Sequence, residues 1–366
     1  MIIRPAYYFE TSGVPVFQPT YEEFKDFYTF IQSVEKYGMK AGLIKVIPPQ
    51  EWLDSNKASP ELIKKFTIKK PIKQVFNCGG LPAGAHRQLN METKKSYTIQ
   101  DWFDITETDF KPPIMTDLGK MVLPAQIKKR KHKAVQEDEN ITSKKTALEP
   151  SVEDKSSGNE INMENHDIVP ISEIPDVPIV KEEYLTQNPA FISKFASKPS
   201  LEYLAALERF YWRNLSFQPT MYGADLLGTL FQENPDNKWN VAHLENLLSK
   251  VAINVPGVTK PYLYFGMYKA TFAWHVEDMD LFSINYIHFG APKQWYVIPP
   301  AHRSRFERFA KGTFFNEAHE CPDFLRHKNC VISPSVVSAQ NIPVHKLVQF
   351  ANEFVITFPS GTRFFF

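Results

Sequence analysis

Residues 261–298, PYLYFGMYKATFAWHVEDMDLFSINYIHFGAPKQWYVI, carry the clearest structural signal in this chain. Short runs of aromatic and β-branched residues alternate there with Gly, Pro and Asp, a pattern typical of short strands joined by turns. With a similar run near residue 355, they predict a β-sandwich or jelly roll, interrupted by a helix at residues 302–311. The strands are expected at residues 262–265, 270–275, 282–288, 294–298 and 353–358.

Within this stretch, a histidine and a carboxylate lie two residues apart, at His275 and Glu277. On a β-strand the period of two turns both side chains to the same face, which is what a metal ion requires of neighbouring ligands. The pair alone carries little weight, because 10 histidines and 41 acidic residues in 366 give about one such triplet by chance. Its context therefore has to decide its role.

Length and composition limit the class of protein. With 366 residues, 43% of them hydrophobic, the chain can bury a large core and form about two globular units. Three cysteines are too few for a disulfide framework, which favours a reducing compartment. No apolar run has the length of a membrane span, and the N-terminus lacks the pattern of a secretory signal. A net charge of +1 excludes attraction of the whole molecule to DNA but leaves local patches open.

Aromatic residues mark the expected domain boundaries. The 73 residues from 111 to 183 contain no Phe, Tyr or Trp, whereas the other 293 hold all 50. This segment is rich in Lys, Glu, Ser, Asn and Pro, so it is expected to be a disordered linker or insertion. Its basic block at residues 128–133 is either a nuclear import signal or nucleic-acid contact, or an ordinary solvated charge run. The expected domains are residues 1–110, 111–183 and 184–366.

The first expected domain opens with a clear helix signal. Thr20 and Glu23 form a capping box, and the apolar residues after it recur with helical spacing. Gly38 is the expected end of this helix, and a short buried strand is expected at residues 41–49. The apolar face of the helix would consist of Phe24, Phe27, Tyr28, Ile31 and Val34.

Two further helices are expected in the C-terminal domain. One runs from Ser200 to Tyr211. The other would be capped by the side chain of Asn240. Its apolar face would hold Leu244, Leu247, Leu248 and Val251.

Several of these segments resemble a known family. Tyr222-Gly-Ala-Asp225, Pro261-Tyr-Leu-Tyr-Phe-Gly-Met267 and His288-Phe-Gly-Ala-Pro-Lys-Gln-Trp-Tyr296 resemble the JmjC domain of histone lysine demethylases. Residues 19–27 and 41–52 resemble the JmjN domain that accompanies it. Both blocks stand in the family order and cover most of the chain outside the linker.

The resemblance implies an α+β fold in which an α/β JmjN unit and the linker precede a cupin-like double-stranded β-helix, or jelly roll. It points to the JmjN/JmjC demethylases that act on trimethylated lysines 9 and 36 of histone H3. The long linker resembles the fungal branch, which includes transcriptional repressors. Members of this demethylase family are nuclear dioxygenases and chromatin regulators. The expected partners are therefore a methylated H3 tail and chromatin, with no membrane and no strong sign of direct DNA binding.

The resemblance also assigns roles to residues of the reaction centre. Family members hold Fe(II) with two histidines and one carboxylate, and His275 and Glu277 match the first two ligands. Lys293 matches the lysine that pairs with the distal carboxylate of 2-oxoglutarate. The remaining cosubstrate residues are Tyr222 and Asn285 as hydrogen-bonding partners, and Trp295 and Phe272 as apolar walls.

Substrate and zinc residues follow in the same way. Three positions match residues whose oxygens face the methylated ammonium in relatives. These positions are Gly257, Tyr264 and Glu277, while Asp225 and Lys328 match residues near the peptide groove. Cys321 and His327 match half of a structural zinc site, whose other two ligands in relatives are cysteines beyond the JmjC core.

The chain departs from the family after the strand that ends at Pro359. A Tyr-His segment supplies the third iron ligand there in relatives, and by count Arg363 takes the position of that histidine. A guanidinium has five donors and no acceptor, so it cannot ligate Fe(II). Because the sequence departs from the family after Pro359, the jelly roll is also expected to lack its last strands. Phe364 to Phe366 are expected to add exposed apolar surface, so incomplete folding or aggregation is expected.

Three functions stay open at this point. The first is a histone H3 demethylase that uses Fe(II), 2-oxoglutarate and oxygen to hydroxylate the N-methyl carbon, after which formaldehyde leaves. The second, preferred for the chain as written, is a pseudo-demethylase that keeps the fold and binds peptide or 2-oxoglutarate without turnover, because loss of one imidazole weakens a three-ligand site. The third is a cupin-like sandwich unrelated to chromatin, which the paired JmjN and JmjC blocks disfavour.

Overall fold

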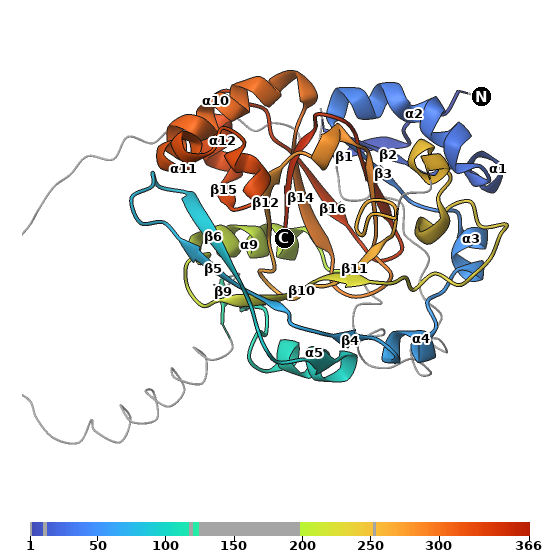
Figure 1. Ribbon diagram of the computed structural model, residues 1–366, viewed down its shortest axis with the longest axis horizontal. Coiled ribbons are helices and arrows are strands. Elements are labelled where there is room, and N and C mark those ends of the chain that lie inside the picture. The colour runs from blue at the N-terminus through green and yellow to red at the C-terminus, as the bar shows by residue number, and fades with distance from the viewer. Residues whose placement is uncertain (1, 10–12, 117–119, 124–197, 252–253) are drawn as a thin grey trace, which may run out of the picture. The chain divides into compact units, whose positions relative to one another are not determined.

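The computed structural model describes residues 2–9, 13–116, 120–123, 198–251 and 254–366 (Figure 1). The chain forms two compact units, of which the first consists of residues 1–111 and 176–366 and the second of residues 112–175. In the second unit, β8 (Ile114–Met115) pairs with β9 (Met121–Val122) in a short hairpin. Residues 124–183 of the predicted linker, including its basic block, lie outside the described residues.

Three sheets form the frame of the first unit. One has the strand order β1 (Tyr7–Phe9), β2 (Val14–Phe17), β3 (Leu43–Val46), β17 (Phe354–Thr357), β13 (Ser283–Tyr286). Another has the order β11 (Tyr262–Phe265), β10 (Thr220–Leu227), β5 (Ile72–Asn77), β6 (Ala85–Glu92), β15 (Cys330–Ile332). The third has the order β12 (Phe272–His275), β18 (Thr362–Phe365), β14 (Lys293–Ile298), β16 (His345–Gln349). These curled sheets confirm the predicted α+β jelly roll.

Helices pack around the sheets, with α10 to α12 together on one side of the unit and α1 and α2 on another (Figure 1). A short ladder of β4 (Thr67–Ile68) and β7 (Tyr97–Thr98) lies between α4 and α5 in the sequence. The helices are α1 (Tyr21–Phe24), α2 (Phe27–Ala41), α3 (Gln50–Ser55), α4 (Pro60–Lys64), α5 (Ile99–Glu107), α9 (Leu201–Arg213), α10 (Arg303–Thr313), α11 (Phe315–Glu320) and α12 (Pro334–Ala339). None of those in the described ranges combines the length and apolar character of a membrane span.

The N-terminal helix differs from its prediction in two respects. The capping box of Thr20 and Glu23 is present, but α1 ends after one turn and Asp26 caps the separate helix α2. Gly38 does not end α2, which continues to Ala41 and closes at Gly42 in the left-handed conformation. Gly38 serves packing instead, because a Cβ there would lie 2.2 Å from the ring of Phe358. The break also rotates the apolar face, so that Tyr28 is 62% exposed.

The second C-terminal helix was also predicted wrongly. Asn240 does cap, accepting a hydrogen bond from the backbone of Ala242 at 3.0 Å. The chain then forms two short 3₁₀ turns, η2 (Val241–His243) and η3 (Leu247–Val251), in place of one α-helix. Leu247 is 81% exposed, so the apolar spacing that suggested a buried face does not lead to burial there.

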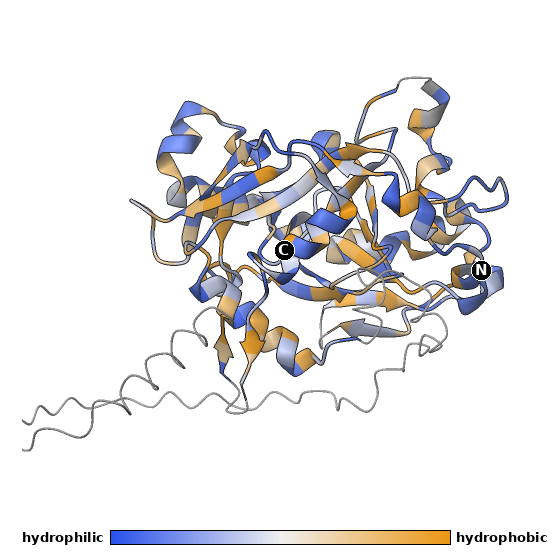
Figure 2. Cartoon of the chain, turned by 90° about the horizontal axis from the view of Figure 1, so that it is seen from below, coloured by the Kyte–Doolittle hydropathy of each residue, from blue (hydrophilic) through white to orange (hydrophobic). Residues whose placement is uncertain are grey.

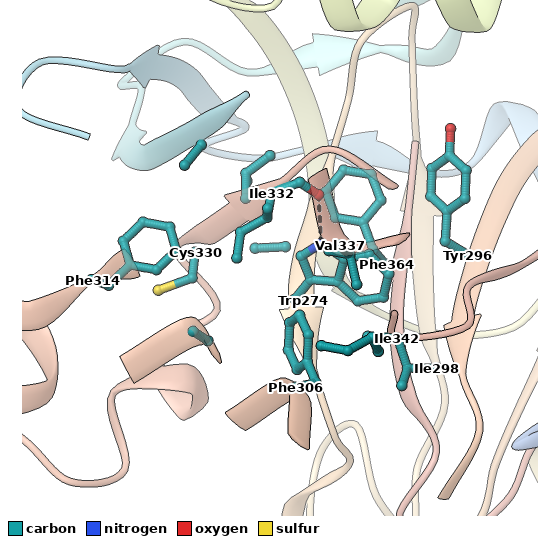
Figure 3. Packing of buried hydrophobic residues seen from close by; sticks show 14 of the residues in the cluster. Trp274, Tyr296, Ile298, Phe306, Phe314, Cys330, Ile332, Val337, Ile342 and Phe364 are labelled. Carbon is teal, nitrogen blue, oxygen red and sulfur yellow. Dashed lines mark hydrogen bonds between the residues drawn. The ribbon is translucent and has the colours of Figure 1, made fainter. Parts of the chain in front are cut away.

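The largest core cluster among the described residues is formed mainly by the third sheet, strand β15 of the second sheet, and helices α10 and α12 (Figure 3). Trp274 occupies its centre and donates from Nε1 to the carbonyl oxygen of Ile332 at 2.8 Å. Phe364 is fully buried against Trp274 and Tyr296, with ring centroids 5.6 and 5.7 Å away. Burial of one such side chain contributes about 1.5–3 kcal/mol. Coloured by hydropathy, the ribbons alternate between hydrophobic and hydrophilic residues, as expected where each element buries one face (Figure 2).

The tail after Pro359 was expected to be exposed, and this expectation is wrong. Residues 362–365 form β18, which pairs with β12 on one side and with β14 on the other. Phe366 stacks on Tyr211, with ring centroids 3.8 Å apart. The tail is therefore an inner strand of the third sheet, and it runs beside the predicted reaction centre.

Candidate active site

His275 lies at the end of β12 and is buried. Its Nδ1–H donates to the carbonyl oxygen of Ala273 at 2.7 Å, so the second ring nitrogen, Nε2, carries the lone pair. Burial holds the pKa of His275 well below its usual range, and the positive charges of Arg363 and Lys328 lower it further. The side chain is therefore a neutral imidazole, as a metal ligand would be.

Arg363 faces His275 across the ladder of β12 and β18. Its side chain is only 2% exposed, and its Nη2 forms an ion pair with Oε1 of Glu277. Burial lowers the pKa of Arg363, while the carboxylate of Glu277 raises it. The guanidinium stays charged at neutral pH. A cation therefore occupies the place next to the two predicted iron ligands.

The residues present do not fit an Fe(II) ion held by three protein ligands. Among the residues that the structure describes, no three His, Cys, Asp or Glu side chains converge on one point. The one carboxylate of the pair, Glu277, is already engaged with a guanidinium, which has no lone pair to offer. Within the described residues, the predicted zinc residues likewise gain no third ligand: Cys321 is partly buried and His327, in η6 (Phe324–His327), is exposed.

The predicted cosubstrate residues Lys293 and Asn285 lie together at the other end of the site. Nζ of Lys293 donates to Oδ1 of Asn285 at 3.4 Å. Burial lowers the pKa of Lys293 to about 8. Gln349, which sequence reasoning missed, holds this arrangement: its Oε1 accepts from Nε1 of Trp295 at 2.9 Å, and its Nε2 donates to the backbone oxygen of Asn285 at 3.1 Å.

The predicted apolar walls, Phe272 and Trp295, lie on either side of a third ring, Phe365. The centroid of Phe365 is 5.1 Å from that of Phe272 and 4.4 Å from that of Trp295. Tyr222 completes this aromatic group, with its ring edge-on to Phe272 at 6.3 Å. Sequence reasoning treated Phe365 only as part of an apolar tail.

Three of the predicted substrate residues, Tyr264, Asp225 and Glu277, lie close to one another and to Tyr222. The ring of Tyr264 is 5.9 Å from that of Tyr222. Burial raises the pKa of the Tyr264 hydroxyl, and nearby negative groups, Asp225 and Glu277 among them, raise it further. Tyr264 is still 37% exposed, so an aromatic face with acidic neighbours is open to solvent.

Lys328 and Gly257, the other two predicted substrate positions, have different surroundings. Nζ of Lys328 lies 5.6 Å from the ring centroid of Phe272 and 3.8 Å from a carboxylate oxygen of Asp278. Gly257 has positive φ and packs against the ring of Tyr262, where a Cβ would come within 2.4 Å. Lys328 is thus next to the centre, whereas the contacts of Gly257 are with Tyr262.

Comparison with known proteins identifies the two blocks of the chain. Residues 15–48 match the jmjN domain, and residues 262–362 match the JmjC domain described as a hydroxylase. The chain carries a JmjN domain and a JmjC domain. All predicted site residues from Tyr264 to Lys328 lie within the JmjC match, and they include His275 on β12.

Curated relatives are similar along almost the whole chain. Lysine-specific demethylase 4B of Mus musculus is 32% identical over 353 residues, and lysine-specific demethylase 4D of Rattus norvegicus is 33% identical over 354. Probable lysine-specific demethylase 4F of Homo sapiens is 32% identical over 353 residues. Each comparison covers 95% of this chain, but only 24%, 51% and 41% of the respective relative. The chain thus spans about a quarter to a half of their lengths.

Neighbouring strands carry the residues that the sequence singled out for the reaction centre; Tyr222 precedes the JmjC match, and the others lie within it. Strands β10, β12, β13 and β14 supply Tyr222, Phe272, His275, Asn285, Lys293 and Trp295, while Glu277 follows β12. Strand β18 lies between β12 and β14 and carries Arg363 and Phe365. Both side chains point to the same face, because residues two apart on a strand point the same way. Arg363 and Phe365, which follow the last residue of the JmjC match, are therefore neighbours of the residues predicted for the reaction centre.

Proposed function

We propose that this chain is a chromatin-associated, histone-tail-binding protein of the JmjN/JmjC demethylase type in which demethylation is lost. The ion pair of Arg363 and Glu277 carries the proposal. It places a fixed positive charge beside His275 and engages the carboxylate that a metal would need. An Fe(II) ion there would meet electrostatic repulsion and lack a third protein ligand.

The proposed ligand is the N-terminal tail of histone H3 carrying methylated lysine 9 or lysine 36. In support, the ring of Tyr264 is partly exposed beside Tyr222, with the carboxylates of Asp225 and Glu277 nearby. Aromatic faces and carboxylates attract methylated ammonium groups through cation–π and charge interactions. A nuclear location follows from this proposed partner.

A second candidate is an active Fe(II)- and 2-oxoglutarate-dependent demethylase of the same substrate. It is favoured by the neutral His275, whose Nε2 lone pair is oriented by the hydrogen bond to Ala273, and by the pair of Lys293 and Asn285. With iron and 2-oxoglutarate bound, dioxygen would be the oxidant for N-methyl hydroxylation. Lys293 would then bind and orient the distal carboxylate of the cosubstrate.

Two measurements on one preparation separate the candidates. The protein is incubated with Fe(II), 2-oxoglutarate and H3 peptides trimethylated at lysine 9 or lysine 36, and the peptide mass is followed. We expect unchanged masses. Loss of mass in steps of one methylene group would overturn the proposed loss of turnover in favour of the second candidate.

Binding is measured in parallel by fluorescence anisotropy with the same peptides and their unmethylated forms. We expect saturable binding with preference for the methylated peptide, weakened by Tyr264→Ala. Tyr8→Ala is the matched control, because Tyr8 is a 48% exposed tyrosine on the edge strand β1. Absence of methyl-dependent binding, or equal loss in both variants, would contradict the proposed function.

A further inference from the structure

Strand β18 directs its side chains alternately to two sides of the third sheet. Phe364 enters the core beside Trp274 (Figure 3). Arg363 and Phe365, one residue to either side, point to the opposite face, where the predicted reaction centre lies. One short strand thus contributes a cation next to His275 and an aromatic ring further along the same face.

The ring of Phe365 lies between Phe272 and Trp295, the two side chains predicted to be apolar walls for the cosubstrate. Phe365 is the direct cross-strand partner of Phe272 on one side and of Trp295 on the other. Its ring stacks on Phe272 with an interplanar angle of 23° and touches Trp295 at 4.4 Å between centroids. The two predicted walls are therefore in contact with a side chain of the protein itself.

The ammonium group of Lys293 also has side chains of the protein as its neighbours. Its Nζ lies 4.5 Å from the ring centroid of Phe365 and 5.7 Å from that of Trp295. Its hydrogen bond to Asn285 is long, at 3.4 Å, and within the described parts of the chain no carboxylate forms an ion pair with it. Aromatic faces and an amide thus surround an ammonium group that would otherwise pair with an acid.

The strand that carries Phe365 is held firmly. It is hydrogen-bonded along both edges, to β12 and to β14. Phe364 is fully buried, and Phe366 stacks on Tyr211 within 5° of parallel. Displacing β18 would expose both neighbours and break two ladders, so the backbone that carries Phe365 is held between Phe272 and Trp295.

We infer that β18 is a built-in occupant of the reaction centre: Phe365 excludes 2-oxoglutarate from the space between the rings of Phe272 and Trp295, as Arg363 excludes the metal. The inference rests on the proposed function for its biological meaning. It makes peptide binding by this domain independent of 2-oxoglutarate and iron concentrations. It also means that a smaller side chain at position 365 uncovers a latent site for a dicarboxylate beside Lys293 and Asn285.

The test uses 2-oxoglutarate itself as the probe, without added metal. Binding to the full chain is measured by calorimetry and by the rise in Tm, for the wild type and for Phe365→Ala. We expect no saturable response from the wild type, and a saturable response from Phe365→Ala that is lost in Phe365→Ala/Lys293→Met. Phe282→Ala is the matched control, because Phe282 is 46% exposed and packs on Phe358.

Saturable binding of 2-oxoglutarate to the wild type would overturn the inference without needing any variant. So would a folded Phe365→Ala protein that fails to bind. If that variant does not fold, Phe365→Leu replaces it, since leucine keeps the apolar contacts with Phe272 and Trp295 but removes the planar ring. Binding of 2-oxoglutarate to the wild type without demethylation contradicts only this inference. Absence of methyl-dependent peptide binding contradicts only the proposed function.

Discussion

Removing either partner of the ion pair between Arg363 and Glu277 should lower stability, but by different amounts. Arg363 is 2% exposed, whereas Glu277 is 26% exposed, so the cation depends more on its partner than the anion does. Glu277→Gln leaves a buried guanidinium without a counter-charge, and losses of about 3–5 kcal/mol are typical of that situation. Because water can reach the carboxylate side, we expect about 3 kcal/mol. Arg363→Met leaves a carboxylate that can hydrate, and we expect about 1 kcal/mol.

The free energy of unfolding is measured by urea titration of both single variants and the double variant. The double variant should resemble Arg363→Met, giving a coupling energy of about 3 kcal/mol. As a control, Arg303 and Asp280 form a more exposed ion pair at 2.8 Å, for which we expect about 0–1 kcal/mol. Equal losses for the two single variants, or additive losses in the double variant, would refute the reasoning.

Two further predictions concern packing and pH. Gly38→Ala should lower the free energy of unfolding by about 1–3 kcal/mol, because its Cβ would lie 2.2 Å from the ring of Phe358. Gly312→Ala, also helical but with nothing within 4 Å of the new Cβ, should be neutral or raise it by up to about 1 kcal/mol in the same urea titration; a similar loss in both would contradict this. Burial raises the pKa of Glu353, but its ion pairs with Lys45 and a second lysine outweigh this and hold the pKa below 4.5. A carboxylate with a lowered folded-state pKa contributes stability above its unfolded pKa and loses it as pH falls through the folded value, so the wild type should lose this contribution below about pH 4.5. Urea midpoints of the wild type and Glu353→Gln should converge as pH falls through that range, and a constant difference would argue against it.

The strands of the jelly roll could be predicted because their signal is local. Aromatic and β-branched runs between turn residues located β11 at Tyr262–Phe265 without error and β14 within one residue. The helix expected from Ser200 to Tyr211 corresponds to α9, which runs from Leu201 to Arg213. Each of these elements depends on neighbours within a few residues.

Long-range packing explains the errors. Nothing near Gly38 in the sequence indicates that the ring of Phe358, more than three hundred residues away, requires a glycine in the helix. Leu244, Leu247, Leu248 and Val251 have helical spacing, yet the chain forms 3₁₀ turns there and leaves Leu247 and Leu248 exposed, so spacing alone did not decide the structure.

The reaction centre shows the same limit. His275 and Glu277 are two residues apart, so their proximity could be read from the sequence. The place of Phe365 between two walls depends on the register of three strands, which sequence spacing does not contain. Counting from the family motif assigned Arg363 to the position of the third iron ligand. Its ion pair with Glu277 could not be predicted from sequence, because it depends on how the two side chains are oriented in the fold.

The ladders between the two sequence halves of the first unit have a consequence for how the gene can change. Strands β3, β5 and β6 precede residue 112, and they pair with β17, β10 and β15, which all follow residue 198. A single cut between these halves would leave two fragments that hold each other in one fold, as in a split protein. Since closing a longer loop costs only about 0.6 kcal/mol for each doubling of its length, the connecting segment is free to grow or diverge while the JmjN and JmjC domains stay joined.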